Sequence, residues 1–200
     1  MRRWEGWAMK PVGISVLTIC GIEELPEHGP RAVTHVLSLL DPSWPELTGF
    51  QGYGKHSRTT LRFHDVIDPG PGLTLPTLEH VGEILAFGSG LAAETGDAAA
   101  RHLLVHCHMG ISRSTAAMVS LLAQIDLQES EDRLFERVRQ IRPQAWPNSL
   151  MIGYADDILG REGRLVAALR RHYGFQVRER PQFVDWMRRL ARDRELDMAE

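Results

Sequence analysis

Four short apolar runs, set among longer segments of helical pattern, constrain the fold of this chain more than any other feature of its sequence. The runs cover residues 12–19, 34–40, 59–64 and 102–106. Short runs that are apolar almost throughout are typical of strands buried on both faces. Strands that alternate with helices indicate a layered α/β structure. We therefore predict an α/β fold with a central, mostly parallel sheet of about four to five strands, flanked by helices.

Helical periodicity recurs between and after these runs. It predicts helices over residues 77–91, 114–125, 130–141, 148–159, 164–172 and 182–191. The second of them is apolar almost throughout and should be buried. The last is rich in charge, and we interpret it as a solvated face on which basic residues alternate with acids. The basic residues of this helix and of the residues that follow it are Arg188, Arg189, Arg192 and Arg194.

The composition of the chain indicates where in the cell the protein works and which classes of partner it does not bind. The 200 residues carry a formal net charge of −3, which gives no electrostatic footprint for nucleic acid. No apolar stretch approaches the length of a membrane span. The two cysteines, Cys20 and Cys107, are too few for a disulfide framework. We predict a cytoplasmic protein that binds neither nucleic acid nor membrane, and the oligomeric state stays open.

The segment from Leu103 to Thr115 reads L-L-V-H-C-H-M-G-I-S-R-S-T and joins an apolar strand to an apolar helix. A loop that feeds a helix N-terminus directs backbone N–H groups at one point and so forms an anion site. Gly110 permits a backbone turn that a side chain would obstruct. Arg113 offers a planar fork of donors that suits two phosphate oxygens. The segment predicts a phosphate site.

Cys107 opens this loop, and the same positive field favours its thiolate form. We predict that Cys107 is a nucleophile aimed at phosphorus, with the hydroxyl of Ser114 donating a hydrogen bond to the sulfur. His106 precedes it on the strand and is expected to orient the loop. His106, Cys107 and His108 would chelate zinc poorly, because neighbours on a strand point to opposite sides. We predict no metal and no cofactor.

Transfer of a phosphoryl group to sulfur also needs an acid for the leaving oxygen. Two aspartates in the stretch F-H-D-V-I-D-P-G compete for this role. Asp68 lies where the strand becomes a loop, and a loop carboxylate can move over a pocket. Asp65 lies three residues earlier, near the end of the strand. The loop placement favours Asp68 slightly, and both stay candidates.

The pattern H-C-x-x-G-x-x-R-S resembles the signature of the protein tyrosine phosphatase superfamily. The segments T-H-V-L-S-L, F-H-D-V-I-D and R-P-x-x-x-P-N are similar to parts of its compact dual-specificity and bacterial branches. The resemblance runs from about residue 12 to residue 159. The interval before Cys107 is long for the compact branch, which suggests an insertion at residues 92–101. The H-D pair recurs among bacterial relatives, which restores Asp65 to equal standing.

The resemblance implies a phosphotyrosine-phosphatase-like fold, two-step catalysis through a phosphocysteine, and no metal cofactor. The aspartate would act as acid and then as base. Separately from the resemblance, Asn148 is a candidate for positioning the hydrolytic water and is equally well explained as a helix N-cap. We predict a phosphatase domain at residues 1–175 and a C-terminal helical extension at 176–200. The implied phosphate-binding residues are His108, Met109, Gly110, Ile111, Ser112 and Arg113.

Several functions remain open. The leading hypothesis is a protein tyrosine or dual-specificity phosphatase whose partner is a phosphorylated protein or a small phosphomonoester. Phosphoinositides and the 5′ phosphates of RNA are alternative substrates, but the loop contains no lysine and the chain is not basic. A silent module that binds phosphate without hydrolysis is a further alternative. A sulfurtransferase of the rhodanese kind also uses a loop cysteine, but Ser114 and the aspartate segment fit phosphate chemistry better.

Overall fold

The structure is a computed structural model that describes residues 16–94 and 101–200. It contains a four-stranded sheet in the order β1-β4-β2-β3, and every neighbouring pair is parallel. The predicted α/β fold is thus confirmed. The strands are β1 (Val16–Cys20), β2 (His35–Leu40), β3 (Ser57–Arg62) and β4 (His102–His106). Residues 12–15 of the first predicted strand and residues 95–100 of the suggested insertion lie outside the described residues.

The helices follow the predicted pattern with two additions. They are α1 (Leu25–His28), α2 (Leu78–Ala93), α3 (Arg113–Ile125), α4 (Glu131–Ile141), α5 (Ser149–Ile158), α6 (Arg164–Glu179), α7 (Gln182–Arg189) and α8 (Asp193–Asp197). The sequence did not predict α1 and α8, because helices of four and five residues are too short to show a period. Helix α6 continues past its predicted end at residue 172. The domain boundary predicted after residue 175 falls inside α6, and that division stays a prediction.

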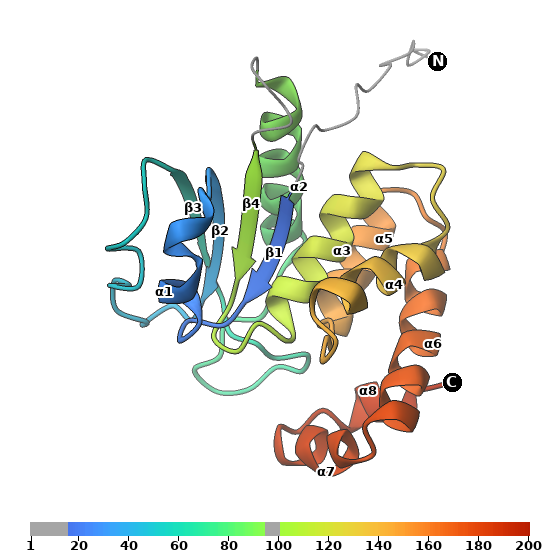
Figure 1. Cartoon of the computed structure of the whole chain (residues 1–200). Coiled ribbons are helices and arrows are strands. Elements are labelled where there is room, and N and C mark those ends of the chain that lie inside the picture. Colours follow the sequence, from blue (N-terminus) through green and yellow to red (C-terminus); the bar gives the residue numbers. More distant parts are fainter. Residues whose placement is uncertain (1–15, 95–100) are drawn as a thin grey trace.

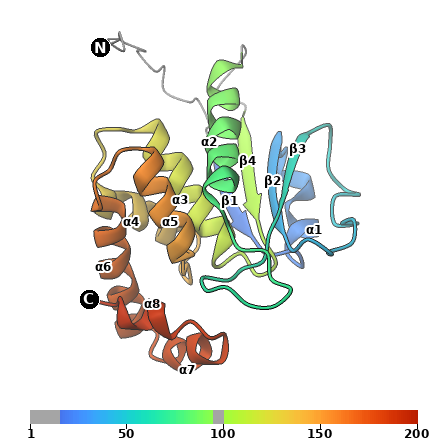
Figure 2. The ribbon, with the colours of Figure 1, turned by 180° about the vertical axis from the view of Figure 1, so that it is seen from behind.

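The two faces of the sheet are covered unequally. Because side chains alternate along a strand, Leu103 and Val105 of β4 enter one core while Leu104 enters another. The larger core lies between the sheet and helices α2 to α6, and the smaller one includes Leu25 of α1. Figures 1 and 2 show α3 to α6 gathered to one side of the sheet, with α7 and α8 at the far end of α6. No helix in the described ranges is long and apolar enough to cross a membrane.

The parallel arrangement brings three chain reversals together at one edge. Strands β2, β3 and β4 end at Leu40, Arg62 and His106. The carboxyl ends of neighbouring parallel strands lie on the same edge, where ligand sites of open α/β sheets form. Asp41 and Cys107 follow directly on their strands, and Asp65 lies in the segment after β3. The candidate site is built at this edge.

Candidate active site

The loop of residues 107–112 joins β4 to α3 and depends on the glycine at its centre. Gly110 has φ = +70°, a conformation that side chains disfavour. A Cβ built there would lie 2.5 Å from the carbonyl carbon of Cys20 and 2.7 Å from the nitrogen of Gly21. Gly110 is therefore required both by its backbone conformation and by close packing against the end of β1.

The carbonyl groups of this loop are bound on its outer side. The oxygen of His108 accepts from the N–H of Ile22 at 2.9 Å, and Arg142 donates to the oxygens of Met109 and Gly110 at 2.8 and 3.1 Å. The oxygen of Ile111 accepts from the backbone N–H of residue 146 at 2.8 Å. In a trans peptide the N–H points opposite to the C=O. The next four N–H groups, at residues 109–112, therefore face away from these partners and suit an anion at the N-terminus of α3.

The thiol of Cys107 lies beside Ser114. Its sulfur is 3.2 Å from the hydroxyl oxygen of Ser114, so that the hydroxyl can donate to it. Cys107 is buried, and it shares no disulfide with Cys20. His106 is fully buried, its Nε2 lies 2.7 Å from the hydroxyl of Ser38, and burial lowers its pKa to about 4. His106 is therefore neutral at physiological pH and anchors β4 to β2.

Arg113, the first residue of α3, keeps part of its guanidinium unused. Its Nη1 donates to Asp41 at 2.8 Å and to the carbonyl oxygen of Phe63 at 2.5 Å. Its Nε is buried and has no hydrogen-bond partner within the described part of the chain. A buried donor without a partner carries a free-energy cost of about 1–3 kcal/mol, which a bound acceptor would relieve. The structure thus holds Arg113 firmly by one nitrogen and leaves another for a ligand.

The structure separates the two candidate acids. Asp65 lies in the same cavity as Cys107 and Arg113. Asp68 does not line that cavity, its side chain is half-exposed, and it pairs with Arg194 at the surface. The loop placement that slightly favoured Asp68 is therefore outweighed by geometry, which brings only Asp65 to the thiol.

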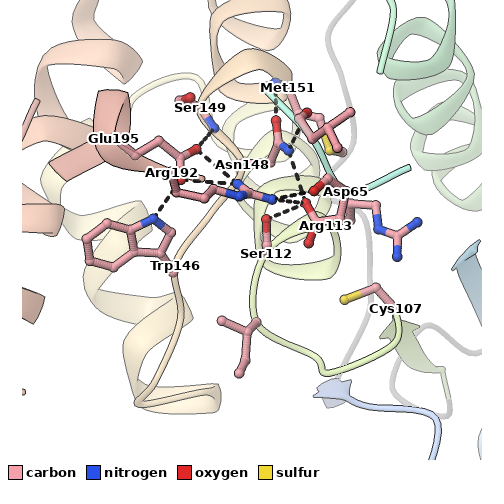
Figure 3. A network of polar contacts seen from close by, with 12 residues as sticks. Asp65, Cys107, Ser112, Arg113, Trp146, Asn148, Ser149, Met151, Arg192 and Glu195 are labelled. Carbon is pink, nitrogen blue, oxygen red and sulfur yellow. Dashed lines mark hydrogen bonds and ion pairs between the residues drawn. The ribbon is translucent and has the colours of Figure 1, made fainter. Parts of the chain in front are cut away.

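Three donors hold the carboxylate of Asp65 (Figure 3). Its Oδ1 accepts from the hydroxyl of Ser112 at 2.7 Å, from Nδ2 of Asn148 at 3.1 Å and from Nη2 of Arg192 at 2.5 Å, and Arg113 adds positive charge nearby. Burial opposes ionisation most strongly, but the two arginines and the two hydrogen bonds outweigh it. The pKa of Asp65 therefore lies below its ordinary value.

Asn148 has two structural tasks. Its Oδ1 caps α5 by accepting from the N–H of Met151 at 3.1 Å, as the N-cap interpretation predicted. Its amide donates to Asp65 and also to the carbonyl oxygen of Val66 at 3.2 Å. The same side chain thus orders the start of a helix and the position of the proposed acid. Its role toward a hydrolytic water stays a prediction.

Arg192 corrects the interpretation of the C-terminal basic residues as a solvated face. The residue is only 4% exposed, because it lies between Asp65 and Glu195. Glu195 is itself fully buried and accepts from the indole of Trp146 at 2.7 Å and from the N–H of Ser149 at 2.8 Å. The sequence did not predict this contact, because the alternation of basic and acidic residues in this segment is equally typical of a solvent-exposed helix. Arg188, Arg189 and Arg194 are exposed as predicted.

A cavity of about 280 Å³ lies over the loop. Its lining includes the polar groups described above, together with His64 and His108. It also includes apolar residues, three of which come from α7 and the turn that follows it. Besides the loop and the two aspartates, Asp41 and Asp65, the cavity is lined by Val66, Trp146, Trp186, Met187, Leu190 and Arg192.

Asp41 and Arg192 are charged site residues that the sequence analysis did not propose. Asp41 follows β2 directly, and the signal for it was available: β2 and β4 are parallel strands, so the residues after them meet at one edge. No local signal existed for Arg192, because 127 residues separate it from Asp65. Within the described ranges, no group of three or more His, Cys, Asp or Glu side chains could hold a metal ion.

No protein-family model matches the chain. Over 130 residues, the chain is 32% identical to dual specificity protein phosphatase 12 of Rattus norvegicus, and this stretch is 65% of the chain and 33% of that protein. The chain thus spans about one third of the length of this curated relative. Its sequence over this stretch and its fold are similar to those of the protein tyrosine phosphatase superfamily.

Solved structures of the superfamily share the fold at low sequence identity. A mouse putative dual specificity phosphatase, crystallised with zinc tungstate, has a TM-score of 0.53 at 20% identity over 82% of this chain and 95% of that chain. Human DUSP28 has a TM-score of 0.51 at 19% identity, over 76% of this chain and 97% of that one. The human tyrosine phosphatase-like serine/threonine/tyrosine-interacting protein has a TM-score of 0.53 at 16% identity, over 75% of this chain and 95% of that chain. These likenesses concern the fold of the superfamily.

Proposed function

We propose that this protein is a cysteine-dependent phosphomonoester hydrolase. The observation that carries the proposal is a cavity lined by both Cys107 and Arg113, where the Nε of Arg113 has no hydrogen-bond partner among the described residues. The carbonyl groups of the loop are bound on its outer side, so that the backbone N–H groups of residues 109–112 are available as donors. Together with Arg113 they can bind a tetrahedral oxyanion next to the thiol of Cys107. Phosphoryl transfer needs mainly such positioning and charge stabilisation.

In the first step, the thiolate of Cys107 attacks phosphorus and forms an S–P bond while the P–O bond of the ester breaks. Asp65, in its protonated form, gives its proton to the leaving oxygen. A phosphate dianion near Asp65 raises the pKa of the carboxyl, because a like charge disfavours the ionised form. Substrate binding therefore favours the protonation state that the acid needs.

In the second step, water attacks the phosphorus of the phosphocysteine. The carboxylate of Asp65 takes the proton of this water, the S–P bond breaks, and inorganic phosphate leaves. The hydroxyl of Ser114, 3.2 Å from the sulfur, stabilises the departing thiolate. The low resting pKa of Asp65 suits this step, since a base must be ionised.

The apolar lining residues of the cavity support aryl phosphates, and hence phosphotyrosine, as the substrate class. Trp186, Met187 and Leu190 offer an apolar surface to the group that carries the phosphate. A phenyl ring gains from such contacts, whereas a short serine side chain does not reach as far. Reduced, unpaired cysteines fit the cytoplasmic location that we also propose.

The test is turnover of phenyl phosphate by the purified chain, with a divalent-metal chelator present. We expect turnover by the wild type, loss of it in Cys107→Ser, and retention in Cys20→Ala, which removes the other buried thiol. Acid quench during turnover should trap phosphate on the wild type and not on Cys107→Ser. Turnover by Cys107→Ser equal to the wild type would refute the mechanism.

A panel of substrates tests the finer proposal. We expect a phosphotyrosine peptide to be hydrolysed faster than a phosphoserine peptide, a phosphoinositide or an RNA with a 5′ phosphate. Faster release from either of the last two would assign the chain to the alternative substrates. Tight binding of the phosphotyrosine peptide by the wild type without any phosphate release would instead identify a silent phosphate-binding module.

A further inference from the structure

Arg192 connects the C-terminal segment to the proposed acid through both ends of its guanidinium. Its Nη2 donates to Oδ1 of Asp65 at 2.5 Å and to the backbone oxygen of the same residue at 2.8 Å. Its Nη1 donates to both carboxylate oxygens of Glu195 at 3.2 and 3.1 Å. The side chain is nearly buried and lines the cavity, so that these contacts are shielded from solvent.

Glu195 fixes Arg192 from behind. Its carboxylate is fully buried and also binds the indole N–H of Trp146 and the backbone N–H of Ser149. Trp146 stacks on Tyr173 with 4.3 Å between ring centroids. Figure 3 shows the resulting chain of contacts from Trp146 through Glu195 and Arg192 to Asp65. A buried ion pair held on both sides has one geometry, so Arg192 presents a fixed pair of donors to Asp65.

We propose that Arg192 is a positioning residue for Asp65, and that the segment 190–197 is thereby a functional part of the active site. This inference rests on the proposed function, in which Asp65 is the acid. Two donors from one guanidinium nitrogen, to the side chain and to the backbone of Asp65, fix where the carboxyl group lies relative to Cys107. Positioning of this kind is worth large factors in rate.

Several groups face Asp65 from other elements. Arg113 of α3 and Arg192 lower the pKa of Asp65, and Ser112 and Asn148 donate hydrogen bonds to it. His108 of the loop and Tyr173 of α6 also lie within electrostatic reach. Both are neutral near pH 7, since burial first and Arg113 second lower the pKa of His108, and burial raises that of Tyr173. Removal of the Arg192 charge therefore leaves Arg113 as the remaining cation, and the pKa of Asp65 rises.

The experiment compares pH–rate profiles of the full chain and of three variants. Arg192→Met removes the charge. Arg192→Met with Glu195→Gln also neutralises the buried partner, so that the chain keeps a foldable core. Arg192→Lys keeps the charge and is the conservative rescue. The substrates are phenyl phosphate, whose leaving group is about as basic as tyrosine, and p-nitrophenyl phosphate, whose leaving group needs less protonation.

In both variants without the charge, we expect kcat for phenyl phosphate to fall about 10- to 100-fold, with a much smaller loss for p-nitrophenyl phosphate. The basic limb of the profile should move to higher pH, and Arg192→Lys should restore it. A carbon NMR titration of the Asp65 carboxyl should show the same rise in pKa. The rate loss and the pH shift together distinguish positioning from a fold defect.

The inference would be overturned if the basic limb of the pH–rate profile or the pKa of Asp65 stayed the same in the variants without the charge. It would also be overturned if these variants lost rate equally on both substrates. The NMR titration does not depend on turnover. If the wild type hydrolyses neither substrate, the proposed function fails, and the titration still decides whether Arg192 sets the protonation of Asp65. If turnover is present and the titration is unmoved, only the inference about Arg192 fails.

Discussion

Replacement of Gly110 by alanine tests whether the proposed phosphate-binding loop is held by backbone conformation and close packing. The new methyl group would meet two costs at once. An L-residue at φ = +70° is strained by about 1–2 kcal/mol. The Cβ would also lie 2.5 Å from the carbonyl carbon of Cys20 and 2.7 Å from the nitrogen of Gly21. These atoms belong to the backbone of the last residue of β1 and of the residue after it. The clash therefore cannot be relieved by rotation of a side chain, and overpacking adds a cost of about 1–3 kcal/mol.

The sum predicts that Gly110→Ala loses about 2–5 kcal/mol of unfolding free energy, together with most of its turnover, because the loop must shift off β1. Alanine substitutions at two other glycines serve as controls that separate the cost of backbone strain from the cost of close packing. Gly72 has φ = +72° and open space around its Cβ position, so Gly72→Ala should lose only about 1–2 kcal/mol. Gly153 lies inside α5 with open space, so Gly153→Ala should gain up to about 1 kcal/mol.

The assay is urea unfolding of the four proteins, followed by circular dichroism and fitted with a common slope. Phenyl phosphate turnover is measured on the same preparations. If Gly110→Ala were no less stable than Gly72→Ala, the contact with β1 would contribute nothing and the packing argument would be refuted. Full turnover in Gly110→Ala would show that the loop tolerates displacement, contrary to its proposed role as an oxyanion cradle.

Three further predictions concern other contacts. Asp41→Asn removes the anionic partner of Arg113, and loss of a charged hydrogen bond of about 1.5–3 kcal/mol should lower kcat/KM for phenyl phosphate about 10- to 100-fold; an unchanged kcat/KM would contradict it. Trp146→Phe leaves buried Glu195 one donor short and should cost at least about 1 kcal/mol in urea unfolding. Burial lowers the pKa of His172 to about 3 from 6.5, so the unfolded chain binds its proton more readily. Stability should therefore fall by up to about 1.4 kcal/mol per unit as the pH decreases from 6.5 toward 3, and His172→Gln should remove that part of the slope.

The sequence was most informative where the chemistry is local. Cys107, Gly110 and Arg113 lie within seven residues, and the strand before them and the helix after them have clear patterns. The order of the four parallel strands was not predictable from these patterns. It depends on which runs pair, and nothing within a single run specifies its neighbour. The meeting of Asp41 with Arg113 depends on that order, since β2 pairs with β4.

The choice between Asp65 and Asp68 could not be made from the sequence for a different reason. Both follow β3 within a few residues, and the turn between them decides which carboxyl faces the loop. The deciding contacts come from Ser112, Asn148 and Arg192, which are distant in sequence. Arg192 is the clearest example of what the sequence could not predict. Its charged neighbours predicted solvent exposure, but Arg192 is buried because it pairs with Glu195, which is itself bound by the indole of Trp146.

The contact between residues 65 and 192 also has a consequence for biosynthesis. A growing chain that has reached residue 175 already contains all four strands, the phosphate-binding loop and helices α2 to α5. It lacks the guanidinium that holds Asp65, so the sheet and the thiol can form before the acid is in place. Turnover of basic leaving groups should then appear only after residue 195 has been translated and the Arg192–Glu195 pair has docked. A nascent chain arrested before that point would contain the proposed nucleophile in a folded loop, and we expect it not yet to hydrolyse phosphotyrosine.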